Sequence, residues 1–370
     1  MKPKILVNTA AGKIGFAVAM QLLKKDYPVR AFVHRKSTRA QQLKDAGAEI
    51  YVGNMLDIRD VRKSLRGIQR SFYSWPVESN HLHANMIFAT AANEAKLEVV
   101  TKLTQWFSNP VHPSFYTREH WLTDEVMSWM PNVDVVTVNP ALFADNIFFV
   151  LEMIAQLGMM PLPIANSLNA PPSNEDIARV AVGTLIDPKP HIGKSYRPTG
   201  PALISPQDMV DIFSRILDKK IKYMDVSEAM LLKTMTAQGY PKVALSQLRH
   251  YMEEHKRTAL TIDAPNNVVR DIGGRDPEDF ETIARRYIAE RPEAKRTMVN
   301  KLKAIKFFIK MLLTPSPDMD KYERDQGHPL IANPEYSSDS NEWLSTHEKT
   351  DSQTYNVTSI KNVNTYLSAK

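Results

Sequence analysis

Residues 4–15 read KILVNTAAGKIG, a short apolar run that passes into small and polar residues and two glycines three positions apart. Apolar residues at helical spacing follow over 14–22, and a second apolar run at 29–33 ends in three basic residues. This order is typical of a strand, a tight turn, a helix and a second strand. The sequence therefore predicts a βαβ unit that begins within the first few residues.

The turn of this unit has the composition of a phosphate-binding loop. Such a loop reverses sharply, brings its backbone close to a pyrophosphate and starts a helix whose free N–H groups face the anion. Gly12 and Gly15 suit the close approach and the packing of helix on strand, whereas Thr9 stands where the usual pattern has its first glycine. A threonine hydroxyl can still donate a hydrogen bond to a phosphate. The residues predicted to bind the cofactor here are Thr9, Ala11, Gly12, Lys13, Ile14 and Gly15.

The end of the second strand predicts which dinucleotide is bound. Arg35 follows Gly15 by 20 residues, the separation at which this strand end meets the adenosine ribose. An acidic residue there would accept hydrogen bonds from a 2′-hydroxyl, but this chain has His34, Arg35 and Lys36. Adjacent bases suit a 2′-phosphate through charge-assisted hydrogen bonds. We therefore predict NADP(H) in preference to NAD(H), with an ordinary solvated basic turn as the alternative.

The composition excludes several classes of protein. With 43% hydrophobic and 24% charged residues over 370 positions, the chain has the makeup of a soluble globular protein of one large or two small domains. A formal net charge of +6 does not indicate nucleic-acid binding without a clustered patch. The absence of cysteine excludes disulfides, thiolate metal sites and cysteine nucleophiles. No apolar run reaches the roughly 18 residues of a membrane span, and the early first strand leaves no room for a signal peptide, so a cytoplasmic protein is expected.

Strands and helices alternate through residues 1–140, which we expect to form an NAD(P)-binding domain. Further apolar runs at 48–52, 70–76, 97–103 and 133–138 are typical of strands, with helical segments between them. Six such strands predict an α/β fold, a Rossmann-like doubly wound parallel sheet. Because ligands bind these sheets at the carboxyl ends of the strands, the cofactor crevice is also expected to include Asn54, Met55, Trp75, Lys102 and Asn139.

The regular alternation weakens after residue 140. Residues 141–290 predict a smaller α/β region that leans over the crevice and supplies substrate contacts. Residues 291–314 predict a basic amphipathic helix, which is expected to dock on the core or at a homodimer seam. Binding to a protein partner or to an anionic membrane surface are the alternatives. The apolar residues at helical spacing in this segment are Val299, Leu302, Ile305, Ile309 and Leu312.

The last part of the chain, residues 315–370, is rich in Ser, Asn, Asp, Thr and Lys. A segment of this composition buries too little apolar surface to fold alone, so we expect it to be largely disordered. Tyr322, Trp343 and Tyr355 are the side chains that could attach it to the surface.

Several short stretches follow one another in an order that is typical of a known family. After the opening turn at 5–15 come Gly53-Asn54-Met55-Leu56-Asp57, Lys102-Leu103-Thr104, Arg118-Glu119-His120-Trp121-Leu122, Asn139-Pro140-Ala141-Leu142-Phe143-Ala144-Asp145-Asn146, Glu175-Asp176-Ile177-Ala178 and Gly273-Gly274-Arg275-Asp276-Pro277. Over roughly residues 3–290 the chain thereby resembles the NmrA-like family of the atypical short-chain dehydrogenase/reductase superfamily. The resemblance implies a Rossmann-like domain and NAD(P)(H) binding. Some members are NADPH-dependent reductases of quinones, carbonyls or related compounds, and others bind the dinucleotide without turnover as redox sensors or regulators.

The chain departs from the family pattern at three positions. The family usually has glycine where this chain has Thr9, and it often has aspartate where this chain has Asn54. Reductases of the wider superfamily carry a Tyr-x-x-x-Lys pair on the helix after the fifth strand, and here that spacing joins Tyr116 to His120. If both are helical they share a face, with Tyr116 as proton donor, His120 as proton relay or ribose ligand, and Thr104 orienting a carbonyl. The alternatives are a loop position for Tyr116 and an interior position for His120.

Aromatic residues near the same strand ends predict a flat, apolar substrate. The candidates are Trp106, Phe107 and Phe143, together with Trp75, and the alternative for each is core packing. The histidines lack metal-ligand spacing, so no metal is expected. We therefore predict an NADPH-dependent reductase that transfers hydride to a small quinone-like or carbonyl compound. The alternative is a catalytically weak NADP(H)-binding redox sensor or regulator that acts through a protein partner.

Overall fold

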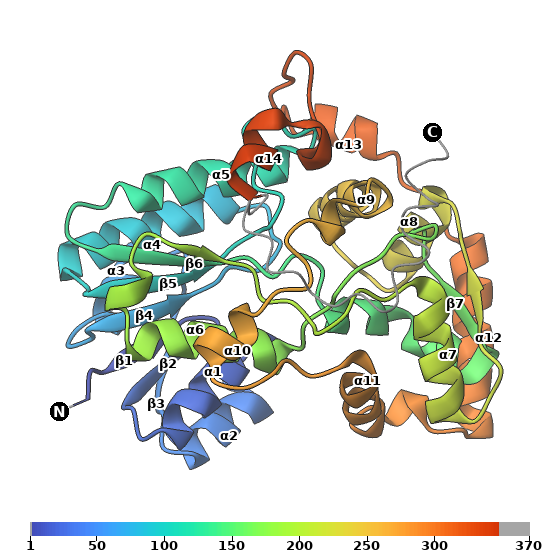
Figure 1. The fold of residues 1–370 in the computed structure, drawn as a ribbon, viewed down its shortest axis with the longest axis horizontal. Coiled ribbons are helices and arrows are strands. Elements are labelled where there is room, and N and C mark those ends of the chain that lie inside the picture. The colour runs from blue at the N-terminus through green and yellow to red at the C-terminus, as the bar shows by residue number, and fades with distance from the viewer. Residues whose placement is uncertain (1, 348–370) are drawn as a thin grey trace.

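The computed structural model describes residues 2–347 and contains a seven-stranded sheet whose neighbouring strands are all parallel (Figure 1). The strand order is β3-β2-β1-β4-β5-β6-β8, so the order reverses between β1 and β4. The predicted Rossmann-like, doubly wound α/β fold is confirmed. Ligands bind such sheets beyond the carboxyl ends of the strands at the reversal. The strands are β1 (Ile5–Val7), β2 (Val29–Val33), β3 (Glu49–Val52), β4 (Arg70–Tyr73), β5 (Val99–Leu103), β6 (Asp134–Val138) and β8 (Ser195–Tyr196).

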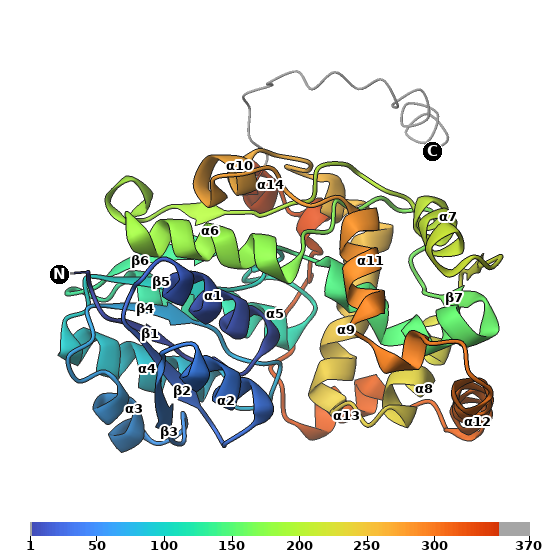
Figure 2. The same cartoon turned by 90° about the horizontal axis from the view of Figure 1, so that it is seen from below.

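Helices cover both faces of this sheet (Figure 2). One face carries α1 (Lys13–Lys24), α2 (Thr38–Asp45), α6 (Asn174–Ile186) and α10 (Val268–Gly273), which share a core with the sheet. The other face carries α3 (Ile58–Ser64), α4 (His81–Ala95) and α5 (Phe115–Ser128). β8, α6 and α10 therefore belong to the sheet layers. All three lie beyond residue 140, in the part of the chain that the sequence predicts as a separate smaller region.

The remaining segments build a second body beside the ends of the strands. Its core includes Phe148, Phe213 and Phe280, and the Phe213 ring lies 5.7 Å from each of the other two. Its short sheet pairs β7 (Met159–Pro161) with β9 (Lys222–Met224). Its helices are η1 (Ala144–Val150), η2 (Met153–Leu157), α7 (Pro206–Leu217), α8 (Glu228–Ala237), α9 (Lys242–Lys256) and α11 (Phe280–Ala289). Single turns of 3₁₀-helix are η3 (Lys189–His191), η4 (Ala259–Thr261) and η5 (Pro292–Ala294).

The chain after residue 314 is ordered as far as it is described, which differs from the expectation of a disordered tail. It forms α13 (Met319–Asp325), η6 (Ser337–Asp339) and α14 (Asn341–His347), after the preceding helix α12 (Met298–Leu313). Trp343 is buried, and its indole N–H donates to the Trp106 carbonyl at 3.2 Å. One large aromatic side chain therefore outweighs the polar composition around it, because burial of an indole is strongly favourable. Tyr355 lies outside the described residues.

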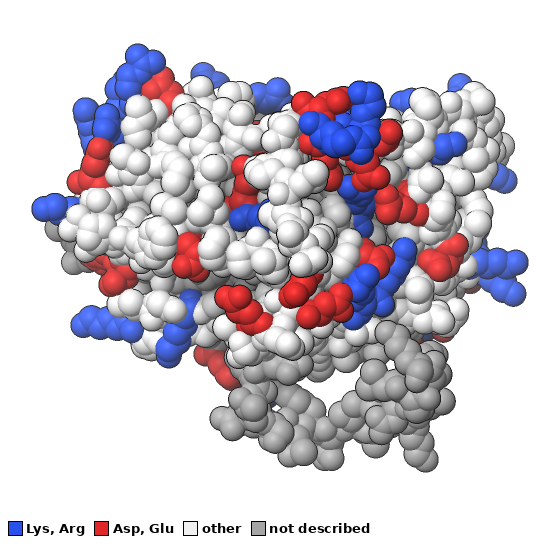
Figure 3. Space-filling model, turned by 90° about the horizontal axis from the view of Figure 1, so that it is seen from above, with Lys and Arg blue, Asp and Glu red and all other residues white. Residues whose placement is uncertain are grey.

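The charge of the chain is spread out on the face seen in Figure 3, where basic and acidic side chains alternate among broad uncharged areas. Within residues 2–347, no helix is long and apolar enough to cross a membrane.

Candidate functional site

The turn between β1 and α1 has the geometry that a pyrophosphate loop needs. Thr9 adopts a left-handed conformation with φ of 47°, as the glycine of the usual pattern would, and its carbonyl accepts from the Gly12 N–H at 2.7 Å. A Cβ on Gly15 would lie only 2.6 Å from the Thr9 carbonyl oxygen, so this position has no room for a side chain. The left-handed conformation costs a non-glycine residue about 1–2 kcal/mol. The Thr9 hydroxyl offsets part of that cost by a 2.6 Å hydrogen bond to the Ser74 hydroxyl.

The same turn is fixed to the neighbouring strand β4. The Asn8 side chain donates to the Ser74 carbonyl at 2.9 Å and accepts from the Ser74 N–H at 2.7 Å. Both residues are buried. This two-bond clamp holds the carboxyl ends of β1 and β4 together where the strand order reverses.

The amino end of α1 is suited to an anion. Among the described residues no side chain caps this end, and its first turn contains no acid, so the positive end of the helix dipole is uncompensated. Lys13, the first residue of α1, pairs with Asp145, which also accepts from Arg291 at 2.7 Å. Two cations thus meet beside the turn with one carboxylate between them.

The predicted adenosine side of the crevice is open to solvent. His34, Arg35 and Lys36 are exposed at the end of β2. Sequence reasoning missed Arg39, whose guanidinium donates to the Ala11 carbonyl at 3.2 Å and lies 5.6 Å from the centre of the Phe16 ring. The position of Arg39 beside the phosphate turn depends on how α2 packs against that turn, and no local sequence pattern predicts this packing.

Asn54 and Met55, which the sequence predicts to bind the cofactor, make contacts within their own loop and with the core beneath it. The Asn54 side-chain oxygen accepts from the Leu56 N–H at 2.9 Å, and Met55 is partly buried against the core under α3 and α4. The Asn54 backbone N–H is held by Asp60 at 2.9 Å. These two hydrogen bonds hold the backbone of the loop that follows β3.

A cavity of about 460 Å³ lies between the ends of β4, β5 and β6 and the helix α9. Of the residues predicted for the site, it is lined by Lys13, Trp75, Thr104, His120 and Phe143. Its remaining walls are largely apolar, with Leu142, Ile164, Met209 and Met252 among them. Such a lining suits a small, mostly apolar ligand.

Thr104 and His120, which the sequence predicts as catalytic residues, lie side by side in this cavity. The Thr104 hydroxyl donates to Asp124 at 2.8 Å and lies 3.2 Å from Nδ1 of His120. Because the hydroxyl has one proton, Nδ1–H of His120 must donate to Thr104, which leaves Nε2 of His120 as an acceptor. Burial, reinforced by His81 and Lys102, lowers the pKa of His120 well below its usual value, so the ring is neutral at neutral pH.

Behind this pair lies a buried ion pair between Lys102 and Asp124. The Lys102 side chain is 2% exposed, and burial lowers its pKa although Asp124 opposes the shift. Lys102 also donates to the Thr123 hydroxyl at 3.4 Å. Its ammonium group therefore lies beneath the Thr104–His120 pair, and it does not line the cavity.

Tyr116 lies within α5 and not in a loop, but it is not among the residues that line the cavity. It donates to the Pro76 carbonyl at 3.1 Å and lies 3.3 Å from Nδ1 of His81. Burial raises its pKa. His81, which the sequence analysis did not select, is buried, and its ring centre lies 3.9 Å from that of His120.

Three further candidates support the site without lining it. Trp106 packs against Trp343 and has the Arg197 guanidinium 4.3 Å from its ring centre. Phe107 is fully buried and packs edge-on against the Tyr251 ring at 4.9 Å. Asn139 is buried and donates to the Ser195 hydroxyl at 3.1 Å, joining β6 to β8.

The far wall of the cavity is one face of α9, which sequence reasoning did not select. Gln247, Tyr251 and His255 are spaced four residues apart on this face and all line the cavity. Gln247 is held by Ser114 and Gln105, at 2.9 and 3.3 Å. Within residues 2–347 both ring nitrogens of His255 are buried without a hydrogen-bond partner.

The protonation of this wall follows from its burial. Burial, with Glu254 nearby, raises the pKa of Tyr251, so the phenol keeps its proton. Burial lowers the pKa of His255 to about 3, so its ring is neutral. Buried polar groups without partners are rare, so the two ring nitrogens of His255 are available for hydrogen bonds with a ligand.

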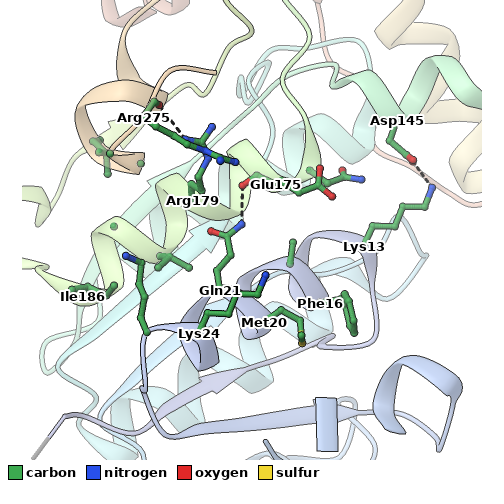
Figure 4. Close-up of a pocket in the computed structure, with 18 of the residues that line it drawn as sticks. Lys13, Phe16, Met20, Gln21, Lys24, Asp145, Glu175, Arg179, Ile186 and Arg275 are labelled. Carbon is green, nitrogen blue, oxygen red and sulfur yellow. Dashed lines mark hydrogen bonds and ion pairs between the residues drawn. The ribbon is translucent and has the colours of Figure 1, made fainter. Parts of the chain in front are cut away.

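A larger hollow of about 1180 Å³ runs between α1, α6 and α10 (Figure 4). It shares Lys13, Asp145 and Arg291 with the cavity but otherwise has charged walls of both signs. Gln21 donates to the Glu175 carbonyl at 3.0 Å and Arg179 to the Arg275 carbonyl at 3.1 Å across it. It lies along the helices and not at the strand ends, so it is a surface groove beside the crevice. No group of three or more His, Cys, Asp or Glu side chains within residues 2–347 is placed to hold a metal ion.

Comparison with known proteins supports the resemblance found in the sequence. Residues 1–101 match the NmrA-like family, which confirms the resemblance for the part of the chain that contains the opening turn. The NAD(P)H azoreductase of Xenophilus azovorans is 25% identical over 239 residues, covering 64% of this chain and 82% of that protein.

Two solved structures share the fold. An NADPH-dependent quinone oxidoreductase from Escherichia coli, complexed with NADPH, has a TM-score of 0.66 at 17% identity and covers 76% of this chain and 99% of its own. NmrA, a negative transcriptional regulator in complex with NADP, has a TM-score of 0.62 at 15% identity and covers 77% of this chain and 94% of its own. At these identities the likeness shows a shared fold and nothing more.

Proposed function

We propose that this protein binds NADP(H) along the ends of β1 to β4 and reduces a flat, largely apolar quinone-like or carbonyl compound in the 460 Å³ cavity. The observation that carries this proposal is the cavity itself. Its apolar walls bring together Lys13 from the phosphate turn and the Thr104–His120 pair from the end of β5. The likeness to an azoreductase and to a quinone oxidoreductase supports the same class of reaction.

The residues at the strand ends fit a dinucleotide. The uncapped end of α1 and Lys13 are suited to the pyrophosphate. Because Gly15 has no side chain, α1 can lie close enough to the turn for the backbone to contact the pyrophosphate. Arg35 and Lys36, with Arg39 beside them, are suited to a 2′-phosphate. When bound, NADPH supplies a hydride to the substrate.

The protein must then orient the substrate and provide a proton to the reduced oxygen. Neutral His120 presents an acceptor nitrogen in the resting arrangement, so it orients a hydroxyl or ribose group and does not donate. Tyr251 keeps its proton and lines the cavity, so we infer that it is the proton donor. His255, one turn further along α9, would then bind a second oxygen, which favours a quinone over a simple ketone.

The experiment is an assay of NADPH oxidation, followed by absorbance, with quinones, ketones and azo dyes as substrates. We expect turnover with at least one quinone. Tyr251→Phe should lower kcat about 100-fold, the typical contribution of a positioned acid. Tyr116→Phe is the matched control and should change kcat less than about threefold, because Tyr116 does not line the cavity and its hydroxyl bonds to the Pro76 carbonyl. Equal losses in the two variants would count against Tyr251 as the donor.

A second candidate function is a redox sensor that binds NADP(H) without turnover and acts through a protein partner. The observation that favours it is His120 at the position of the usual lysine, together with the likeness to the regulator NmrA. Tight NADPH binding with no turnover on any of these substrates would favour the sensor over the reductase.

The charge at the end of β2 makes a separate prediction. Arg35→Asp should weaken NADPH binding about 30-fold or more and leave NADH binding within about threefold, because a charge-assisted hydrogen bond is worth roughly 1.5–3 kcal/mol. The matched control is Lys44→Asp, which removes another exposed base at the distal end of α2. Calorimetric titration of both variants with both nucleotides measures the effect. Equal weakening of NADPH and NADH by Arg35→Asp would rule out recognition of the 2′-phosphate by this residue.

A further inference from the structure

Helix α12 docks on the second body by only one of its two apolar faces. Ala304 and Met311 are buried, and Phe307 and Phe308 are partly buried against the small core that contains Met153 and Ala237. The Lys310 ammonium donates to the Ala237 carbonyl at 2.6 Å and fixes the end of the helix to α8. Figures 1 and 2 both place α12 at the edge of the molecule beside α8.

The opposite face of α12 is a continuous exposed apolar row. Positions 298, 302, 305, 309 and 312 are alternately four and three residues apart, so they share one side of the helix. Leu302 and Ile309 are 53% and 51% exposed, and Leu313 is 80% exposed. The row includes most of the residues that the sequence predicts to dock on the core. The exposed large apolar residues of this helix are Met298, Val299, Leu302, Ile305, Ile309, Leu312 and Leu313.

The charges on this helix all have one sign. Lys301, Lys303, Lys306 and Lys310 accompany the apolar row, and the helix contains no aspartate or glutamate. Arg296 precedes the helix, and Lys219 lies near its start, where burial and the neighbouring Arg296 and Lys301 lower the pKa of Lys219. On a helical wheel, Lys306 borders the apolar row on one side, with Lys310 and Lys303 beyond it, and Lys301 borders the row on the other side.

We propose that α12 binds the surface of an anionic phospholipid membrane, with its apolar row in the headgroup region and Lys301, Lys303 and Lys306 against the lipid phosphates. An apolar ridge bordered by lysines is the composition of a helix that lies in the membrane interface. Each lysine near an anionic leaflet adds to binding, and salt weakens this contribution. The helix projects from the edge of the molecule, so a flat surface can reach the whole row without rearrangement of the sheet.

A second copy of the chain fits this face less well. Pairing two α12 helices along their apolar rows would bring lysines of one copy against lysines of the other, with no acid in either helix to oppose them. The anionic surface is the occupant that matches both the apolar row and the charge.

The test is flotation of the full-length protein with phosphatidylcholine vesicles, with and without about one third phosphatidylserine. We expect binding to the mixed vesicles at low salt, at least about tenfold weaker binding to phosphatidylcholine alone, and loss of binding at 0.5 M salt, about twice the screening of physiological buffer. The double variant Leu302→Glu/Ile309→Glu should reduce binding at least about tenfold. So should Lys303→Gln/Lys306→Gln, because each lysine contributes roughly a fivefold factor.

The matched control is Ile192→Glu, which places an acid at an apolar residue of similar exposure (42%) away from α12. It should float as the unchanged protein does, and circular dichroism checks that all variants are folded. Absence of binding to either vesicle, or binding that ignores the charge of the lipid, would overturn the proposal. So would size-exclusion with light scattering that shows a dimer converted to a monomer by Leu302→Glu/Ile309→Glu, since a second copy would then cover the row.

Discussion

Gly15→Ala should weaken NADPH binding at least about 100-fold. A Cβ at this position would meet the Thr9 carbonyl oxygen at 2.6 Å and the Ala10 Cα at 3.2 Å, and both belong to backbone that cannot swing aside. The turn must open or α1 must move away from β1, and overpacking of this kind costs about 1–3 kcal/mol before any contact with phosphate is lost. Calorimetric titration with NADPH measures the affinity, and thermal unfolding measures the change in stability.

The control for this prediction is Gly67→Ala. Gly67 has a positive φ of 72°, and nothing lies within 4 Å of the site of its Cβ. Its replacement should lower stability by about 1 kcal/mol and leave NADPH affinity unchanged. If Gly15→Ala binds NADPH as the original chain does, the turn is not the phosphate site. Lys13→Met, which alters only a side chain of the turn, gives a second reading should Gly15→Ala fail to fold.

Asp124→Ala should lower the free energy of unfolding by about 3–5 kcal/mol, because it leaves the Lys102 ammonium buried without its carboxylate. Lys102 is 2% exposed, whereas Asp124 is 20% exposed, so the lysine bears the larger penalty. The variant also removes the acceptor of the Thr104 hydroxyl, which frees the tautomer of His120. Urea denaturation measures the stability.

The double variant Lys102→Met/Asp124→Leu separates the ion pair from the packing around it. Apolar replacements of similar volume often match or exceed the stability of a buried pair. We therefore expect most of the loss seen in Asp124→Ala to be recovered. A loss below about 1 kcal/mol in Asp124→Ala would mean that water reaches Lys102 and that the pair is not buried in solution.

The opening βαβ unit could be predicted from the sequence because its signals are local. Apolar runs, two glycines and helical spacing lie within about 30 residues, and each agrees with the same fold. The sequence also indicates Thr104 at a strand end and His120 on the helix that follows, but the hydrogen-bond distance between them was not predicted. Thr9 is instructive, since its left-handed φ follows from the position and not from the residue.

The features of the site and of the C-terminal segment that could not be predicted from the sequence depend on contacts between distant parts of the chain. Tyr116 and His120 are four apart on α5, yet only His120 lines the cavity, because Pro76 and His81 hold the Tyr116 hydroxyl elsewhere. The α9 wall with Tyr251 and His255 carries no local motif, and an amphipathic helix of ordinary composition gives no sign of which cavity it will face. Residues 319–347 are attached by contacts with distant parts of the chain, among them the ion pair of Arg249 with Asp320 and the hydrogen bond of Trp343 to the Trp106 carbonyl, which spans 237 residues.

The two apolar faces of α12 illustrate the same limit. The sequence identifies a helix with an apolar stripe but not which stripe is covered. In the structure Ala304 and Met311 contact the core, and the longer row that includes Leu302 and Ile309 faces outward. Shape decides this outcome, since the small Ala304 lets the helix approach its neighbours closely.

The most direct test of selective NADP(H) binding is calorimetric titration of the full-length protein with NADPH and with NADH under one set of conditions. We expect one NADPH bound per chain, with an affinity at least about tenfold higher than that for NADH, because the bases that follow β2 can pair with a 2′-phosphate. No heat of binding with either nucleotide, or equal affinity for both, would contradict it.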